Sequence, residues 1–228
     1  MRFPILWFDL DDTLLDFSAS SHPAFSALCK EIGLTEQEDS YSVYDRFNKV
    51  EWKLFEQGKI TQEELKLSRF QNYFDHIGFQ YDGYQANGIY LKYIAEFPVY
   101  VDGAEDLLND INTAGFTSTI VTNGMKEVQR LRIQQCNWEH YFEHIFVSDE
   151  IGFAKPQIEF FDHCLQASGH PNKEDIIIIG DTLASDILGA KRAGISSCWI
   201  NPDGKIHPPG IRPDYEIKAL NELIDIIK

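Results

Sequence analysis

The sequence has no long apolar run, and its apolar start is broken early by an acid. The longest uninterrupted aliphatic run is Ile176 to Ile179, which is far too short to cross a bilayer. At the beginning of the chain, Asp9 interrupts the apolar residues before any cleavage site, so no secretory signal peptide is expected. These absences predict a cytoplasmic protein with no membrane partner.

Cysteines and basic residues are also scarce. The four cysteines are scattered and form no C-x-x-C pair, so disulfide scaffolds and zinc sites are not expected and a reducing compartment fits. Lys and Arg number 20 against 36 Asp and Glu, a net charge of −16, which argues against nucleic-acid or anionic-membrane partners. A phosphate ligand would be repelled at long range. Its site would need local positive potential from a metal ion, a lysine or backbone N–H groups.

The 228 residues suffice for one large domain or for a domain with an insertion. Residues 4–9 are typical of a central parallel strand, because apolar side chains occupy both faces. Four helices are predicted next, over residues 22–32, 42–57, 61–77 and 83–96. Aromatic residues recur in them at helical spacing, which favours the core of a helical bundle over a ligand-stacking surface.

Capping residues set the ends of these helices. Ser21 is the candidate N-cap of the first helix, with Pro23 in its first turn. Thr61 and Glu64 have the spacing of a capping box at the start of the third. The fourth helix is expected to stop before Pro98.

After Pro98 helices and strands alternate. Strands are expected at 117–121, 145–147, 175–179, 196–200 and 215–217, and helices at 103–114, 125–136, 157–167, 185–193 and 220–227. The alternation predicts an α/β fold with a doubly wound, Rossmann-like parallel sheet, into which the helical bundle is inserted. Residues 1–16 and 99–228 would form the catalytic core, and residues 17–98 a helical cap domain. Such sheets bind ligands beyond the carboxyl ends of their strands, where Asp9, Thr122 and Asp181 all stand.

The first strand ends in three carboxylates and a hydroxyl, Asp9 to Thr13. Carboxylates gathered at a buried strand end repel one another, so a nearby cation such as Mg²⁺ is expected. Asp9 could attack phosphorus and form an aspartyl-phosphate, and Asp11 could protonate the leaving oxygen and then activate water. The alternative is an ordinary turn in which Asp11 and Asp12 cap a following helix.

Three further motifs follow strands or precede helices. Thr122 and Asn123 offer a hydroxyl, an amide and exposed N–H groups to phosphate oxygens, although Thr-Asn-Gly is also an ordinary turn. Lys155 lies at the start of a helix, a position that a lysine avoids unless it faces an anion, although it could also be a solvated side chain. Asp181 and Asp186 lie around another helix start, where they could ligate Mg²⁺ and orient the lysine or could simply cap the helix.

Together these segments resemble the haloacid dehalogenase (HAD) superfamily of phosphatases. Phe8 to Leu14 matches the family's D-x-D-x-T motif, Val121 to Gly124 its second motif, Lys155-Pro156 its third and Gly180 to Asp186 its fourth. This resemblance implies that Asp9 is the nucleophile and a metal ligand, and that Asp11 is the general acid/base and a metal ligand through its carbonyl. It also implies that Thr122, Asn123 and Lys155 bind phosphate and that Asp181 ligates the metal. Asp186 would contact the metal ligands or would ligate the metal through a water molecule.

A narrower resemblance, to the YjjG-type pyrimidine 5′-nucleotidases, is carried by residues 48–52, 58–61 and 68–71 of the helical region and by residues 186–190 and 198–201. It implies a Mg²⁺-dependent phosphomonoesterase acting on a nucleoside 5′-monophosphate, with Phe17, Trp52 and Arg69 as candidates to contact base or sugar. The alternatives are a phosphatase of sugar phosphates or phosphoglycolate-like metabolites, and a catalytically silent binding module on the same fold. Neither the oligomeric state nor the preferred base is readable from the sequence.

Overall fold

In the computed structural model, which describes residues 1–228, six parallel strands form one sheet in the order β3-β2-β1-β4-β5-β6. The strands are β1 (Ile5–Phe8), β2 (Thr117–Thr122), β3 (His144–Val147), β4 (Ile176–Gly180), β5 (Ser196–Ile200) and β6 (Tyr215–Ile217). The chain divides into two units, an α/β unit of residues 1–16 and 99–228 and a helical unit of residues 17–98. The predicted parallel sheet with an inserted helical segment is confirmed.

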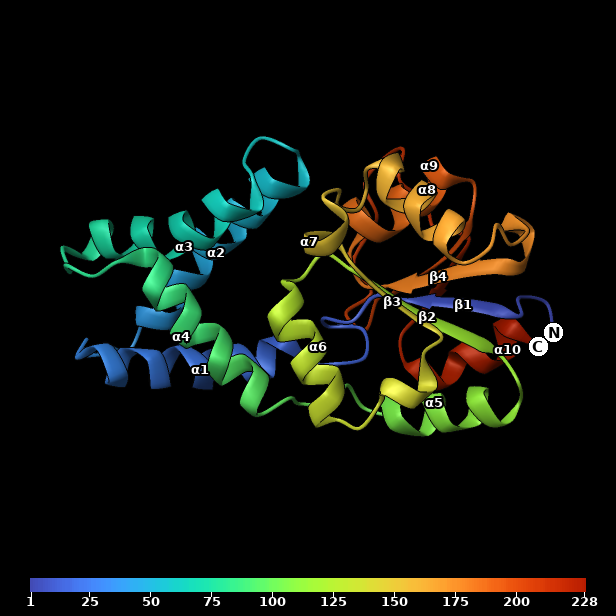
Figure 1. Cartoon of the computed structure of the whole chain (residues 1–228), viewed down its shortest axis with the longest axis horizontal. Coiled ribbons are helices and arrows are strands. Elements are labelled where there is room, and N and C mark those ends of the chain that lie inside the picture. Colours follow the sequence, from blue (N-terminus) through green and yellow to red (C-terminus); the bar gives the residue numbers. More distant parts are fainter. The chain divides into compact units, whose positions relative to one another are not determined.

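Helices cover both faces of the sheet in the α/β unit (Figure 1). Side chains of α5 (Ala104–Thr113), α6 (Lys126–Gln135) and α10 (Leu223–Ile227) join the apolar cluster on one face, and those of α8 (Ile158–Ala167) and α9 (Leu188–Ala193) join the cluster on the other. Alternate strand residues supply the two clusters, as Leu6 and Phe8 do for the first and Trp7 for the second. Burial on both faces explains why the two central strands, β1 and β4, carry no polar side chain.

Short elements complete the α/β unit: η1 (Glu139–Tyr141), α7 (Ser148–Ile151), η2 (Lys173–Asp175), η3 (Leu183–Ile187) and η4 (Leu220–Glu222). The single helix predicted over 185–193 is in fact a π-helical turn, η3, that runs directly into α9. The terminal helix predicted over 220–227 is divided in the same way, into η4 and α10. Periodicity alone does not distinguish a π or 3₁₀ turn from an α-helical one, because the difference lies in which carbonyl each N–H reaches.

The helical unit contains α1 (Phe17–Ile32), α2 (Ser40–Glu56), α3 (Gln62–Ile77) and α4 (Gly83–Glu96). Its interior is aromatic: the rings of Phe25 and Tyr44 are stacked with their centroids 4.9 Å apart, and those of Tyr44 and Phe70 at 4.6 Å. Tyr73 and Tyr90 meet this stack edge-on. All five side chains are buried, so the aromatic residues do form the core of the bundle.

The predicted start of the first helix is wrong, whereas the capping box of the third is confirmed. The α1 helix begins at Phe17, so Ser21 is no N-cap and Pro23 lies inside the helix. Burial of Ala24, Phe25 and Leu28 on one helical face outweighs the N–H donor that proline lacks. At α3, the Thr61 hydroxyl accepts from the Glu64 N–H at 3.2 Å, and the Glu64 carboxylate accepts from the Thr61 N–H at 2.7 Å. No helix of either unit combines the length and the apolar run that a bilayer span requires.

Candidate active site at the carboxyl edge of the sheet

Lys155 lies at the centre of the polar residues at this edge. Its Nζ donates to Asp9 Oδ1, to Asp186 Oδ1 and to the carbonyl oxygen of Val121, each at 2.7 Å. The side chain is 1% exposed, so the alternative of a solvated lysine is excluded. Burial alone would lower the pKa of Lys155, but the paired carboxylates of Asp186 and Asp9 outweigh burial and raise this pKa above its usual value. Lys155 is therefore a fixed cation in this structure.

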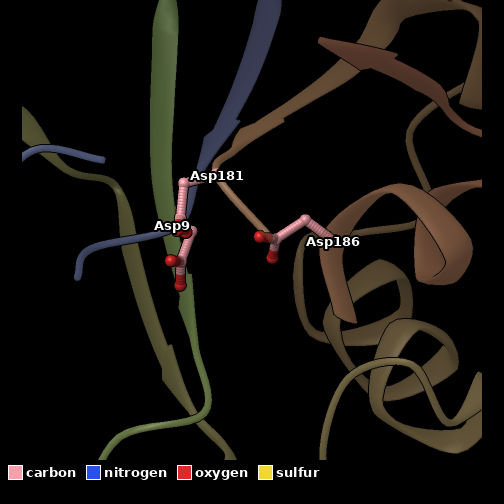
Figure 2. A group of neighbouring side chains, drawn as sticks. All are labelled: Asp9, Asp181 and Asp186. Carbon is pink, nitrogen blue, oxygen red and sulfur yellow. The ribbon is translucent and has the colours of Figure 1, made fainter. Parts of the chain in front are cut away.

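Three carboxyl groups gather around this lysine from separate parts of the chain. Asp9 follows β1, Asp181 follows β4, and Asp186 lies in η3, as Figure 2 shows. Each offers an oxygen, and these atoms all lie within 4.8 Å of one another. Asp181 is fixed through both its main chain and its side chain. Its carbonyl oxygen accepts from Trp199 Nε1 at 2.8 Å, and its Oδ1 accepts from the Thr182 hydroxyl at 3.1 Å.

The close approach of Asp186 depends on glycine at the end of β4. A Cβ added at Gly180 would lie 2.3 Å from Asp186 Oδ2, so no other residue fits there without displacing the carboxylate. That same Oδ2 accepts from the Thr182 N–H at 3.1 Å. Asp186 therefore binds the backbone of Thr182, which precedes the turn η3, and also pairs with Lys155.

The charges at this edge do not balance. Burial raises the pKa of Asp9 well above its usual value, with Lys155 opposing and Asp186, Asp181 and Asp11 adding to the rise. Burial, together with Asp186 and Asp12, raises the pKa of Asp181 to about 7. One ammonium thus faces three carboxyl groups, and two of them, Asp9 and Asp181, resist ionising. A hard divalent cation such as Mg²⁺ prefers oxygen ligands of this kind and would supply the missing positive charge, so the residues present fit it.

Thr122 is the last residue of β2, and Asn123, which follows it, contacts the Lys155 backbone. The Asn123 amide exchanges two hydrogen bonds with the Lys155 backbone: Nδ2 donates to the Lys155 carbonyl and Oδ1 accepts from the Lys155 N–H, both at 2.8 Å. Its side chain is thereby committed to holding the segment that carries the lysine. The Thr122 hydroxyl oxygen accepts from the Gly124 N–H at 3.1 Å and from Gln129 Nε2 at 2.9 Å, which leaves its O–H free to donate.

Asp11 does not join the other three carboxyl groups through its side chain. Its Oδ2 accepts from Gln129 Nε2 at 2.7 Å, and its Oδ1 pairs with the Arg132 guanidinium. Both partners lie on α6. The alternative of Asp11 as a helix-capping acid is therefore wrong, because the next helix begins only at Phe17 and the carboxylate is bound to a different element.

Gln129 and Arg132 are site residues that sequence reasoning missed. Both are buried, whereas Leu131 on the same helix is 46% exposed. Periodicity assigns apolar residues to the inner face of a helix, and here two polar residues occupy that face while a leucine points outward. The one signal in the sequence is that α6 has few apolar residues for a helix packed on a sheet.

The remaining candidates lie in the helical unit. The Arg69 guanidinium is 1% exposed and donates to Asn87 Oδ1 through Nε at 2.9 Å and to Asn48 Oδ1 through Nη1 at 3.2 Å. The Trp52 ring meets Phe55 edge-on at 5.8 Å. Contacts of Phe17, Trp52 and Arg69 with a base or sugar stay predictions.

Comparison with known proteins places this arrangement in a family. The model of the haloacid dehalogenase-like hydrolases matches residues 6–200. The chain belongs to this family. As a member it is an enzyme, a hydrolase, and the match spans the segments that contribute Asp9, Thr122, Lys155 and Asp181. The resemblance inferred from the four motifs is thereby confirmed.

Two relatives and one solved structure match this chain over nearly its whole length. The chain is 34% identical to the pyrimidine 5′-nucleotidase PynA of Streptococcus pneumoniae, over 100% of this chain and 96% of that protein. It is 30% identical to the pyrimidine 5′-nucleotidase YjjG of Escherichia coli, over 100% and 99%. Among solved structures, the magnesium-bound HAD-hydrolase YfnB of Bacillus subtilis superposes with a TM-score of 0.94 at 36% identity, covering 100% of both chains.

Proposed function

We propose that this hydrolase is a Mg²⁺-dependent phosphomonoesterase that acts on pyrimidine nucleoside 5′-monophosphates through an aspartyl-phosphate intermediate. The observation that carries the proposal is the buried contact between Asp9 and Lys155, with Asp181 and Asp186 beside them. A carboxylate that is both desolvated and next to a fixed cation is suited to attack an anionic phosphoryl group, because the cation offsets the repulsion between the two anions.

In the first step, a lone pair of the Asp9 carboxylate forms a bond to phosphorus while the ester P–O bond breaks. Both electrons of the broken bond stay on the leaving oxygen, and Asp11 donates a proton to it. The Lys155 ammonium and the Thr122 O–H stabilise the phosphoryl oxygens. The Asn123 amide positions the lysine through its two hydrogen bonds with the Lys155 backbone, and we assign its phosphate contact to its other N–H donors, the second Nδ2–H and the backbone N–H.

In the second step, Asp11 takes a proton from water, and the water oxygen attacks phosphorus and releases the Asp9 carboxylate and inorganic phosphate. Asp9, Asp181 and the carbonyl of Asp11 would hold Mg²⁺, with Asp186 supporting them. When bound, the ion supplies positive charge to the phosphoryl oxygens. The imbalance between three clustered carboxyl groups, those of Asp9 and Asp186 buried, and one ammonium supports this assignment.

The substrate class rests on the two full-length relatives named pyrimidine 5′-nucleotidases. We assign the helical unit the role of the substrate-selecting cap. A second candidate is a phosphatase of small sugar phosphates, which is supported by a glyceraldehyde 3-phosphate phosphatase of Pyrococcus furiosus that is 27% identical over 100% of this chain. Specificity is the ratio of kcat/KM between the two classes, so one measurement decides between them.

The test is a panel of phosphate esters that includes UMP, CMP, dTMP, AMP, glyceraldehyde 3-phosphate and phosphoglycolate, assayed with Mg²⁺ and with EDTA. The expected result is Mg²⁺-dependent release of phosphate, with kcat/KM highest for the pyrimidine nucleotides. A higher kcat/KM for the sugar phosphates would replace the substrate assignment and keep the chemistry. No turnover of any ester with Mg²⁺ would end the proposal.

A further inference from the structure

Two polar side chains of α6 are enclosed next to the proposed acid/base. Gln129 is 1% exposed and Arg132 is 0% exposed, although neither belongs to the family motifs described above. Burying an amide and a guanidinium together is unfavourable unless their hydrogen bonds are made. Their partners therefore indicate what these residues do.

The Gln129 amide connects two predicted site residues. Its Nε2 donates to Asp11 Oδ2 at 2.7 Å and to Thr122 Oγ1 at 2.9 Å, so the two N–H bonds of one amide are directed at the acid/base and at the phosphate-binding hydroxyl. Its Oε1 accepts from Arg132 Nη1 at 3.1 Å, which fixes the orientation of the amide. Gly124 makes room for it, since a Cβ at that position would lie 2.2 Å from Nε2.

Arg132 fixes the other oxygen of Asp11. Its Nη1 pairs with Asp11 Oδ1, so each oxygen of that carboxyl group has its own donor on α6. The Asp11 side chain is itself 31% exposed, and a carboxyl group exposed to that extent has free rotamers unless its partners restrict it. Two donors on one rigid helix remove this freedom.

We propose that Gln129 and Arg132 are positioning residues: together they fix the orientation of the Asp11 carboxyl group, and Gln129 keeps it aligned with the Thr122 hydroxyl. This inference rests on the proposed function, in which Asp11 gives its proton to the leaving oxygen as the ester P–O bond breaks. Loss of the support lets the carboxyl group rotate away from that oxygen while Asp9 and Lys155 keep their places.

The test uses the dependence of kcat/KM on the leaving group. Nitrophenolate leaves without a proton, whereas the alkoxide of a nucleotide needs one, and kcat/KM reports only the steps up to release of the alcohol. Arg132→Met and Gln129→Met are expected to lower kcat/KM for UMP by about 10²-fold. For p-nitrophenyl phosphate the fall should be about tenfold smaller. The ratio of the two values, measured on one preparation, does not depend on the fraction of enzyme that is folded.

Matched variants on the same helix serve as controls. Arg130 forms an exposed pair with Glu150, with its Nε 2.7 Å from Oε1, so Arg130→Met is expected to leave the ratio unchanged, as is Gln135→Met at an exposed position. Arg132→Lys should recover part of the ratio, because it restores the charge. Gln129→Met should also raise the inhibition constant of inorganic phosphate, and Arg132→Met should raise it less, because of these two residues only Gln129 contacts Thr122 directly.

Two results would overturn the inference in different ways. If Asp11→Asn lowers the substrate ratio but the Gln129 and Arg132 variants lower both substrates by one common factor, the two residues are merely structural and the proposed chemistry stands. If Asp11→Asn itself leaves the ratio unchanged, Asp11 donates no proton, and the assigned role of Asp11 fails together with its supports.

Discussion

The α/β unit and the helical unit each enclose a cationic side chain, but they surround it with different partners. Lys155 lies between the carboxylates of Asp9 and Asp186. Arg69 donates to the amide oxygens of Asn87 and Asn48, and its guanidinium lies 5.3 Å from the centroid of the Phe70 ring. The partners of Arg69 are neutral dipoles and a ring, which satisfy its hydrogen bonds without a carboxylate, whereas the acids around Lys155 outnumber the one ammonium group.

This difference distinguishes a buried cation that joins helices, Arg69, from one to which we assign a role in catalysis, Lys155. The polar contacts of Arg69 join three helices of one bundle, α2, α3 and α4, and account for its burial. The acids around Lys155 leave an imbalance that folding alone gives no reason to keep, because buried like charges destabilise the folded state. We therefore place the chemistry in the α/β unit. Four variants test this contrast, and they follow in order of decreasing effect.

Asp9→Asn removes the proposed nucleophile from the α/β unit. The expected result is a fall in kcat of about 10⁴-fold or more, because an amide does not form the covalent intermediate. The measurement is steady-state phosphate release with UMP and Mg²⁺. The matched variant Asp45→Asn, in the exposed pair with Lys49 of the helical unit, should keep wild-type kcat. Full activity of Asp9→Asn would move the chemistry away from this carboxylate.

Lys155→Met removes the cation from between Asp9 and Asp186. The free energy of unfolding is expected to fall by about 3–5 kcal/mol, because two buried carboxylates lose their shared partner, and turnover should be lost as well. Urea denaturation measures the first effect and phosphate release the second. Lys49→Met, at an exposed pair, should cost less than about 1 kcal/mol. Equal losses for the two variants would show that Lys155 is not a buried charge in solution.

Arg69→Met tests whether the enclosed cation of the helical unit is structural. The expected loss of stability is about 1–3 kcal/mol, because the amide oxygens of Asn48 and Asn87 lose their donor. The KM values for UMP and p-nitrophenyl phosphate should change by the same factor. A rise in KM for UMP alone would mean that Arg69 contacts the nucleoside. The helical unit would then select the substrate, and the α/β unit would carry out the chemistry.

Thr61→Ala removes the capping box of α3 and should produce the smallest effect, about 1 kcal/mol. Two buried thiols report where the loss occurs. Burial first and then Glu36 raise the pKa of Cys29 to about 12, and burial first and then Glu222 do the same for Cys198. A raised pKa keeps each thiol protonated and unreactive at pH 8 until its surroundings open.

Thiol labelling at pH 8 therefore measures opening of the two units separately. In Thr61→Ala, labelling of Cys29 in the helical unit should accelerate by about fivefold, as a loss of 1 kcal/mol implies, while labelling of Cys198 in the α/β unit stays constant. Equal acceleration at both thiols would show that the two units open as one cooperative structure, and the contrast drawn between them would not extend to stability.

Much of the fold could be predicted because its signals are local. Each of the six strands was expected within one or two residues of its place, since a parallel strand buried on both faces is a short apolar run bounded by turn residues. The start of α1 was not predicted, because burial of one helical face overrode the usual place of Pro23 near a helix start. Such tertiary effects have no signature in a short window of sequence.

The candidate site likewise contains some features that the sequence predicts and others that it does not. Local sequence patterns place Asp9, Thr122 and Asp181 at the carboxyl ends of strands in one parallel sheet, and the parallel topology brings these ends to one edge. Only the tertiary structure decided that Lys155 points inward to Asp9, 146 residues away in the chain, and that Arg132 and Gln129 bind Asp11 across 121 and 118 residues. The physical reason is that apolar periodicity is repeated along every element, whereas a buried hydrogen bond depends on a single pair of side chains that the folded backbone brings together.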